Sequence, residues 1–152
     1  MHLRLARCLF CTLACLAIFG CSPKNDISTA IADQLAQTKG TSLNLSEAVP
    51  THWERVCILG PYSDNKTAKA ALGFEWNVEA SSSIQSNDGI SLLLFVLGDR
   101  VISSVEHPRR DGDFSNLSRN CFSRQDALFF YDPKPEKGWP GLFQKNASLP
   151  AL

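Results

Sequence analysis

Titratable side chains gather at one point of the chain, and their types could support proton transfer or anion binding. The run is Glu106-His107-Pro108-Arg109-Arg110-Asp111-Gly112-Asp113. His107 beside Glu106 or Asp113 could move protons near neutral pH, as a small hydrolase requires. The guanidinium groups of Arg109 and Arg110 could bind a carboxylate or a phosphate. The alternative, which we favour, is a solvated loop of mixed charge that binds no ligand. Its arginines would pair weakly with the acidic residues beside them.

Common catalytic motifs are missing from the sequence. It contains no Gly-x-Ser-x-Gly elbow, no Gly-x-x-x-x-Gly-Lys phosphate loop and no His-Glu-x-x-His zinc helix. A zinc site needs three or four converging ligands, and only His52 and His107 follow the first twenty residues. We therefore predict no metal site, no cofactor and no catalytic activity.

The first twenty-one residues have the parts of a bacterial export signal. Two arginines precede an almost unbroken apolar run, which ends in Ile18-Phe19-Gly20-Cys21. The run is shorter than the roughly 20 apolar residues of a membrane-spanning helix, which disfavours an uncleaved anchor. The segment resembles the lipobox of bacterial lipoproteins, with an aliphatic residue three places before the cysteine and a small residue one place before it. Phe19 is bulkier than the residue usual in that family.

The resemblance implies a lipid modification of Cys21. Its sulfur would carry a diacylglycerol, the chain would be cleaved before it, and the new amino terminus would be acylated. Several acyl chains make such anchoring effectively permanent, so the membrane is the first expected partner. Ser22, rather than aspartate, follows the cysteine. The resemblance therefore implies the cell envelope, at the periplasmic leaflet of the outer membrane if the source is Gram-negative.

Two cysteines remain once the signal and the lipid-bearing residue are set aside. Cys57 and Cys121 are the pair, because the other four lie within residues 1–21. In an oxidising envelope an isolated pair favours a structural disulfide, with free buried thiols as the alternative. The two cysteines form no Cys-x-x-Cys arrangement, which disfavours a redox-active role.

The charge balance argues against nucleic acid as a partner. The chain has 15 basic and 15 acidic residues, and Arg4 and Arg7 would leave with the signal. The remaining protein is slightly acidic. Nucleic-acid binding rests on clustered Lys and Arg that neutralise phosphates, and no such surplus exists here.

Composition divides the chain into four parts. We predict a signal peptide at 1–20, a lipidated tether at 21–50, a globular domain at 51–132 and a Pro-containing tail at 133–152. The tether should contain a short helix that begins at Asp26 or Ser28 and ends near Gly40. Because the apolar stripe of this helix is narrow, a loosely ordered arm is the alternative.

Strand patterns dominate the predicted globular domain. Residues 90–97 are apolar on both faces, which indicates the middle of a sheet with material packed on each side. Gly98-Asp99 then joins them to 101–106 as a two-residue hairpin. Further strands are predicted at 53–59 and 127–131.

Two other segments complete the secondary structure. A short helix should start at Ser63 or Asp64 and end at Gly73. The segment 74–85 alternates apolar and polar residues, which indicates a strand or extended segment, with a loop as the alternative for its serine run. The predicted class is α+β: a small single domain with one mainly antiparallel sheet of four to five strands and one or two short helices, stapled by the disulfide.

The tail should be irregular because it contains four prolines, and three large apolar residues lie within it. Trp139, Leu142 and Phe143 could pack on the domain, which we favour, or form an exposed patch used for contact. From these observations we predict a non-enzymatic, lipid-anchored envelope lipoprotein whose domain binds a protein partner or has a structural role. The alternative is a small envelope hydrolase that uses His107 with Glu106 or Asp113.

Overall fold

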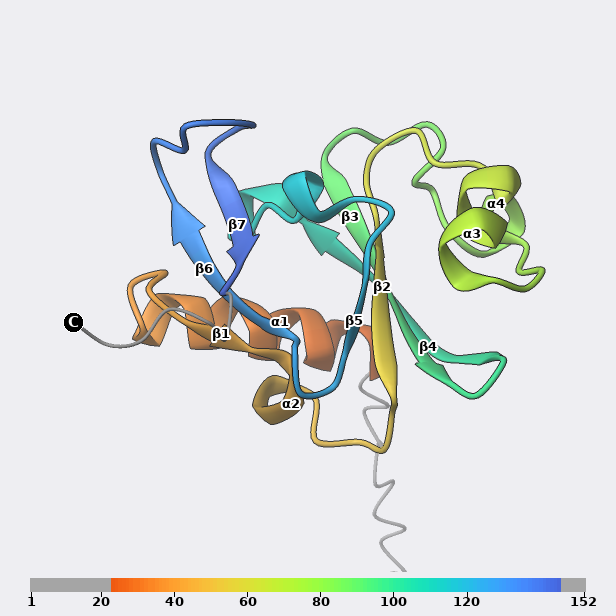
Figure 1. Ribbon diagram of the computed structural model, residues 1–152, viewed down its shortest axis with the longest axis horizontal. Helices are drawn as coiled ribbons and strands as arrows, with labels where there is room; N and C mark the ends of the chain where they lie inside the picture. The colour runs from red at the N-terminus through yellow and green to blue at the C-terminus, as the bar shows by residue number, and fades with distance from the viewer. Residues whose placement is uncertain (1–22, 146–152) are drawn as a thin grey trace, which may run out of the picture.

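The protein contains two antiparallel sheets with helices packed against them (Figure 1). The structure, a computed structural model, describes residues 23–145, with side chains from residue 27 onward. The signal segment and Cys21 lie outside the described residues. Within the described part, no helix is both long enough and apolar enough to cross a membrane.

The strands form a four-stranded and a three-stranded sheet. The four-stranded sheet has the order β4-β3-β2-β5 and consists of β2 (Arg55–Leu59), β3 (Ile90–Leu97), β4 (Arg100–Pro108) and β5 (Cys121–Ser123). The three-stranded sheet has the order β1-β6-β7 and consists of β1 (Leu43–Asn44), β6 (Leu128–Asp132) and β7 (Gly141–Gln144). The α+β class and the antiparallel pairing are confirmed, although the strands divide into two sheets rather than one.

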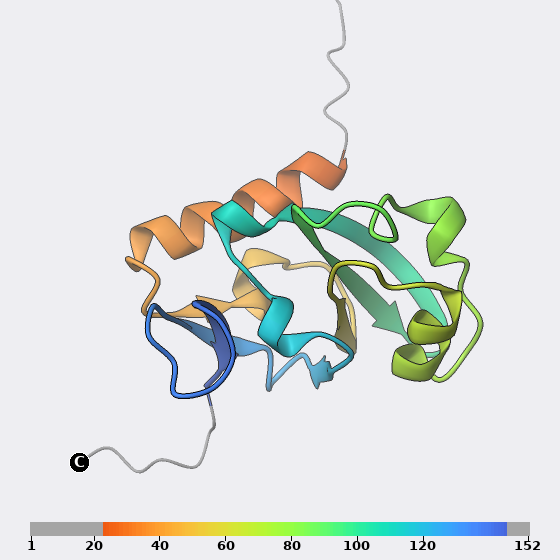
Figure 2. The same cartoon turned by 90° about the horizontal axis from the view of Figure 1, so that it is seen from above.

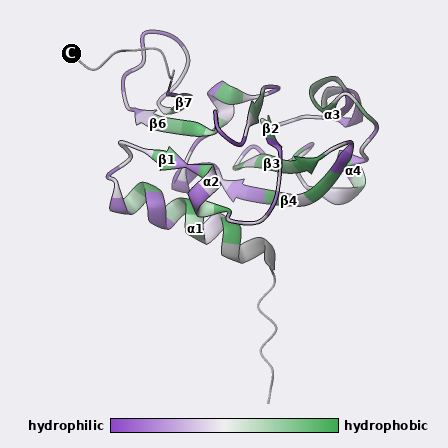
Figure 3. Ribbon diagram, turned by 60° about the horizontal axis from the view of Figure 1, so that its bottom comes forward, coloured by the Kyte–Doolittle hydropathy of each residue, from purple (hydrophilic) through white to green (hydrophobic). Residues whose placement is uncertain are grey.

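Strand β3 lies between two hydrophobic clusters, as its sequence predicts. On one face Leu93 and Phe95 pack toward α1 (Pro23–Gln37) and the three-stranded sheet. On the other face Leu92, Leu94 and Val96 pack toward α3 (Asn65–Leu72) and α4 (Val78–Ser81). Figure 2 shows α1 and α3 on different sides of the four-stranded sheet, and Figure 3 shows the hydrophobic character of β3.

The hairpin between β3 and β4 confirms the predicted two-residue connection. Leu97 pairs with Arg100, and Gly98 has a φ of 58°, the left-handed backbone that such a turn requires. The register shifts once, between Phe95 and Val96, where β4 has a bulge. This bulge has no signal in the sequence pattern.

The core extends further toward the amino terminus than the expected start of the globular domain at residue 51. Helix α1 begins at Pro23, and its residues Ile31 and Leu35 are buried. Leu43 of β1 and Leu45 of α2 (Leu45–Ala48) are also buried. The predicted helix therefore exists, and the described segment from α1 to α2 packs on the core instead of forming a loosely ordered arm, with α1 against β4 and β1 paired with β6.

Local capping signals place α3 correctly. The Asp64 side chain accepts a hydrogen bond from the Thr67 backbone N–H at 2.8 Å, and Gly73 ends the helix with a φ of 84°.

The prediction of a strand or extended segment at 74–85 was wrong. These residues contain the single helical turn α4, which is capped by Asn77, and they form no strand. The positions on either side of β3 in the sheet are occupied by β2 and β4.

The carboxyl tail, expected to be irregular from residue 133, contains β7. Strand β6 confirms the predicted strand at 127–131, and β7 pairs with it, Tyr131 opposite Leu142. Leu142 is fully buried against the core, whereas Trp139 is 72% exposed. The tail thus packs through Leu142 and presents Trp139 to solvent.

A disulfide links Cys57 of β2 to Cys121 of β5, as predicted. The two residues are directly opposite each other in the antiparallel ladder, with their Cα atoms 4.0 Å apart. The bond ties β5, a strand of only three residues, to the centre of the four-stranded sheet.

Candidate functional site

The predicted loop Glu106 to Asp113 begins inside β4, and its first two residues face opposite sides of the sheet. Successive side chains of a strand alternate in direction. Glu106 points toward the α4 segment, where its Oε1 accepts hydrogen bonds from Ser82 Oγ at 2.8 Å and from the Ser83 N–H at 2.6 Å. His107 points into the core and is fully buried. The structure therefore does not bring Glu106 and His107 together.

His107 lies between α1 and β4. Its Nδ1 is 2.9 Å from the Ser28 hydroxyl oxygen of α1, and its ring meets the Phe114 ring edge to face with centroids 5.6 Å apart. Its Nε2 has no hydrogen-bond partner among the described residues. Burial lowers the pKa of His107, and the backbone and charge of Asp111 act in the opposite direction.

Gly112 makes this packing sterically feasible. Its φ is 152°, and a Cβ at this position would lie 2.7 Å from Leu35 Cδ1 and 3.0 Å from His107 Nε2. Only a residue without a side chain allows the backbone to approach α1 and His107 this closely. The glycine therefore fixes how the turn after β4 covers the histidine.

Arg109 and Asp113 form a bidentate ion pair just after the end of β4. The Arg109 Nη2 and Nε atoms lie 2.8 and 3.1 Å from Asp113 Oδ2, and Nη1 donates to the Asp88 carbonyl at 2.8 Å. The Ser115 backbone N–H donates to Asp113 Oδ1 at 2.8 Å. Burial would raise the pKa of Asp113, but the hydrogen bonds from Arg109 and Ser115 outweigh it and lower that pKa. Because Arg109 and Asp113 are bonded to each other and to the backbone around them, they stabilise the fold of the loop.

Arg110 has a looser partner than Arg109. Its Nε lies 3.7 Å from Asp111 Oδ1, and the two side chains are 85% and 41% exposed. An ion pair this exposed contributes little to stability. Each arginine thus has an acidic partner from its own loop, Asp113 for Arg109 and Asp111 for Arg110.

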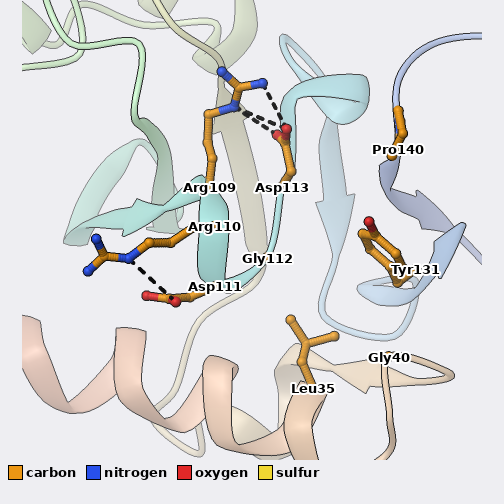
Figure 4. A pocket seen from close by; sticks show the side chains of 9 residues that line it. All are labelled: Leu35, Gly40, Arg109, Arg110, Asp111, Gly112, Asp113, Tyr131 and Pro140. Carbon is orange, nitrogen blue, oxygen red and sulfur yellow. Dashed lines mark hydrogen bonds and ion pairs between the residues drawn. The ribbon is translucent and has the colours of Figure 1, made fainter. Parts of the chain in front are cut away.

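A cavity of about 350 Å³ lies beside this loop (Figure 4). Figure 4 shows the Arg109 and Arg110 guanidinium groups directed away from the Tyr131 side of the cavity. The backbone of the loop and the Tyr131 ring thus form facing walls over Leu35. The lining residues are Leu35, Gly40, Arg109, Arg110, Asp111, Gly112, Asp113, Tyr131 and Pro140.

Sequence reasoning missed a clamp that holds Trp139. The Asn116 carboxamide donates to the Trp139 carbonyl at 2.8 Å, and its oxygen accepts from the Trp139 N–H at 3.0 Å. Both backbone groups of this loop residue are thereby satisfied while its indole stays exposed. The two residues are 23 positions apart, and Asn116 stands in no recognisable motif, so the sequence carried no signal for the contact.

Metal ligands do not converge in the described part of the chain. Among residues 23–145 no group of three or more His, Cys, Asp or Glu side chains is placed to hold a metal ion. Comparisons of the chain with protein-family models, with curated protein sequences and with solved structures found no match.

Proposed function

We propose that the protein is a lipid-anchored lipoprotein of the bacterial cell envelope, and that its domain binds a protein partner through a surface centred on Trp139. The observation that carries the binding role is the exposed indole of Trp139, a residue whose backbone is held by two hydrogen bonds to Asn116. A large aromatic side chain on a backbone that is already ordered supplies much contact area at a small cost in backbone entropy. Tryptophan is also among the residues most enriched at the energetic centres of protein interfaces.

The lipobox supports the anchoring, and α1 limits the distance between anchor and domain. The helix begins at Pro23, two positions after Cys21. Two extended residues span roughly 7 Å, so a lipid on Cys21 would hold α1 close to the membrane surface. The loop between β6 and β7 lies on the other side of the molecule from the start of α1 (Figures 1 and 2). Trp139 would then face away from the membrane.

The neighbours of Trp139 extend the apolar surface. Phe130 and Phe143 are half-buried on the outer face of the β6–β7 hairpin, with ring centroids 6.2 Å apart. Lys134, Glu136 and Lys137 are exposed in the loop that leads to Trp139. An apolar centre with charged residues of both signs at its rim fits a partner whose rim carries complementary charges. The alternative of a hydrolase has less support, because Glu106 and His107 diverge and Asp113 is bonded to Arg109.

The anchor has a direct test. The Cys21→Ser variant should lose incorporation of labelled fatty acid and accumulate as the longer precursor, because no thiol remains to accept the diacylglycerol. Metabolic labelling followed by gel electrophoresis measures both effects. Cys121→Ser, which changes a cysteine of the disulfide, should be labelled like the wild type. Unchanged labelling of Cys21→Ser would refute lipidation at this residue.

The binding surface is tested by substitution of its central residue. Trp139→Ala should weaken binding to the partner about 30-fold or more, because truncation of a central tryptophan typically costs at least about 2 kcal/mol. Cross-linking in envelope membranes, affinity capture and titration of the identified partner give the measurement. Ile102→Ala, which alters another exposed apolar residue on the distant β3–β4 hairpin, is the matched control. Equal recovery of the partner by Trp139→Ala and wild type would contradict the proposed surface.

A further inference from the structure

A buried histidine joins α1 to the four-stranded sheet. His107 of β4 is 0% exposed, and Ser28 of α1 bonds its Nδ1 at 2.9 Å. Directly across the ladder, Ser91 of β3 is also 0% exposed, and its Oγ has no partner among the described residues. A small polar cluster therefore lies among the buried side chains described between α1 and the sheet.

The groups around His107 suit a neutral ring better than a charged one. Ser28 of α1 and Ser91 of β3 carry no charge, and Phe114 and Gly112 supply a ring edge and a backbone. The charged group that acts on the ring is Asp111 of the turn η1 (Arg109–Asp111), whose carboxylate is 41% exposed and faces Arg110. Nε2 is buried and makes no hydrogen bond of good geometry with the described residues, and the cost of burying a charged ring exceeds what the backbone and carboxylate of Asp111 return.

The element that can move to expose His107 is α1. Strand β4 is held along its length by the ladder with β3, whereas α1 contacts β4 through side chains only. The second half of α1 has further attachments, since Gln34 accepts a hydrogen bond from the Asn44 N–H and Leu35 is buried. In the first half, the described contacts are those of Ser28 with His107 and of the partly buried Ile27, and the fully buried Ile31 follows at the middle of the helix. Release of α1 should therefore begin at its amino-terminal end.

We propose that His107 is a pH-dependent latch, which keeps α1 docked on β4 while its ring is neutral and releases α1 when the ring takes up a proton. This inference goes beyond a permanently attached helix. It gives a defined role to the unpartnered Nε2, to Gly112, which lets the turn close over the ring, and to Ser28, which ties the ring to α1.

The direction of the pH effect follows from linkage. Burial lowers the pKa of His107 in the docked state, so the docked protein binds fewer protons than the released one. The stabilisation of docking is complete above the usual histidine pKa of about 6.5 and declines as pH falls below it. Because release takes up one proton, the equilibrium constant for release rises as pH falls below the usual histidine pKa. The rise approaches tenfold for each pH unit and ends at the pKa of the docked state.

Release of α1 would change the reach of the domain if the chain is anchored as proposed. Docked, α1 holds the domain near the lipid. Released, the ~20 residues before β1 become a flexible tether with a typical span of about 25 Å. The consequence for reach rests on the proposed anchor, whereas the latch itself does not.

Hydrogen exchange of the full chain in detergent micelles tests the latch. Between pH 6.5 and 5.5, protection of the α1 amides should fall about fivefold after correction for intrinsic exchange, while β2 and β3 keep theirs. His107→Gln retains a partner for Ser28 but does not titrate, so its α1 protection should be independent of pH. His52→Gln removes the exposed histidine and should behave as the wild type.

Two results would overturn the latch: wild-type α1 protection that does not change with pH, or an equal pH dependence in His107→Gln. Should His107→Gln fail to fold, the imidazole nitrogen signals of the wild type decide. Protonation of His107 together with loss of α1 protection supports the latch, and protonation with α1 still protected refutes it. The same measurement on the Cys21→Ser full chain separates the latch from lipid anchoring, because that chain lacks the lipid.

Discussion

Replacement of Cys57 and Cys121 together by alanine is expected to lower the free energy of unfolding by about 4 kcal/mol. The disulfide closes a loop of 64 residues, and its loss returns that conformational freedom to the unfolded chain. Alanine is preferred to serine because Cys57 is fully buried, where a hydroxyl without a partner would add its own cost. Urea unfolding followed by circular dichroism measures the change.

Reductant provides the control for this prediction. Dithiothreitol should lower the stability of the wild type by a similar amount and leave the double alanine variant unchanged. A loss of less than about 1 kcal/mol in both experiments would show that the unfolded chain gains little freedom when the bond is absent.

Trp53→Ala is expected to destabilise the protein by a comparable amount, about 4 kcal/mol. Trp53 is 1% exposed, its ring meets Phe95 edge to face at 5.3 Å, and the Arg124 guanidinium lies 4.7 Å above it. Its indole N–H donates to the Val49 carbonyl at 2.9 Å. Alanine would leave a cavity, an unpaired carbonyl and a cation without its aromatic partner. Thermal and urea unfolding give the measurement.

Two variants test whether the loss comes from these contacts. Trp53→Phe keeps most of the ring volume but not the N–H donor, so it should cost roughly 1–3 kcal/mol. Trp139→Ala removes the same side chain from an exposed position and should change stability by less than about 0.5 kcal/mol. Equal destabilisation by Trp53→Ala and Trp139→Ala would contradict the burial argument.

Local signals allowed the centre of the fold to be predicted. The apolar run of β3, the two-residue turn after it, and the Asp64 and Gly73 ends of α3 each depend on a few adjacent residues. The alternation in 74–85 was misleading because only Val78 and Ile84 there are fully buried, Val78 from the single helical turn α4 and Ile84 from the turn that follows it. Periodicity reports which side chains are buried, not which backbone partner exists.

The short strands could not be predicted, because their stability comes from distant partners. Strand β1 has two residues and β5 has three, which is too few for a period-two pattern. Strand β7 lies among prolines that argue against regular pairing, yet Leu142 fills a site against Phe129 and its neighbours in the core. Packing at that site outweighed local propensity.

The candidate site was predicted in part. The disulfide followed from cysteine counting, and pairing of the arginines with acidic neighbours was expected because these residues are close in the sequence. The opposite directions of Glu106 and His107 follow once both are assigned to a strand, which the sequence placed only as far as Glu106. The Ser28 partner of His107 is 79 positions away, and no local pattern reports such a contact.

The three-stranded sheet sets the order in which the fold can be completed. Its first strand, β1, pairs with β6. The pairing of Leu43 with Phe129 can therefore form only after most of the chain has been synthesised. Contacts of such long range form slowly. In a protein exported amino terminus first, as proposed, this delay would keep the chain open during translocation and postpone closure of the core until β7 has crossed the membrane.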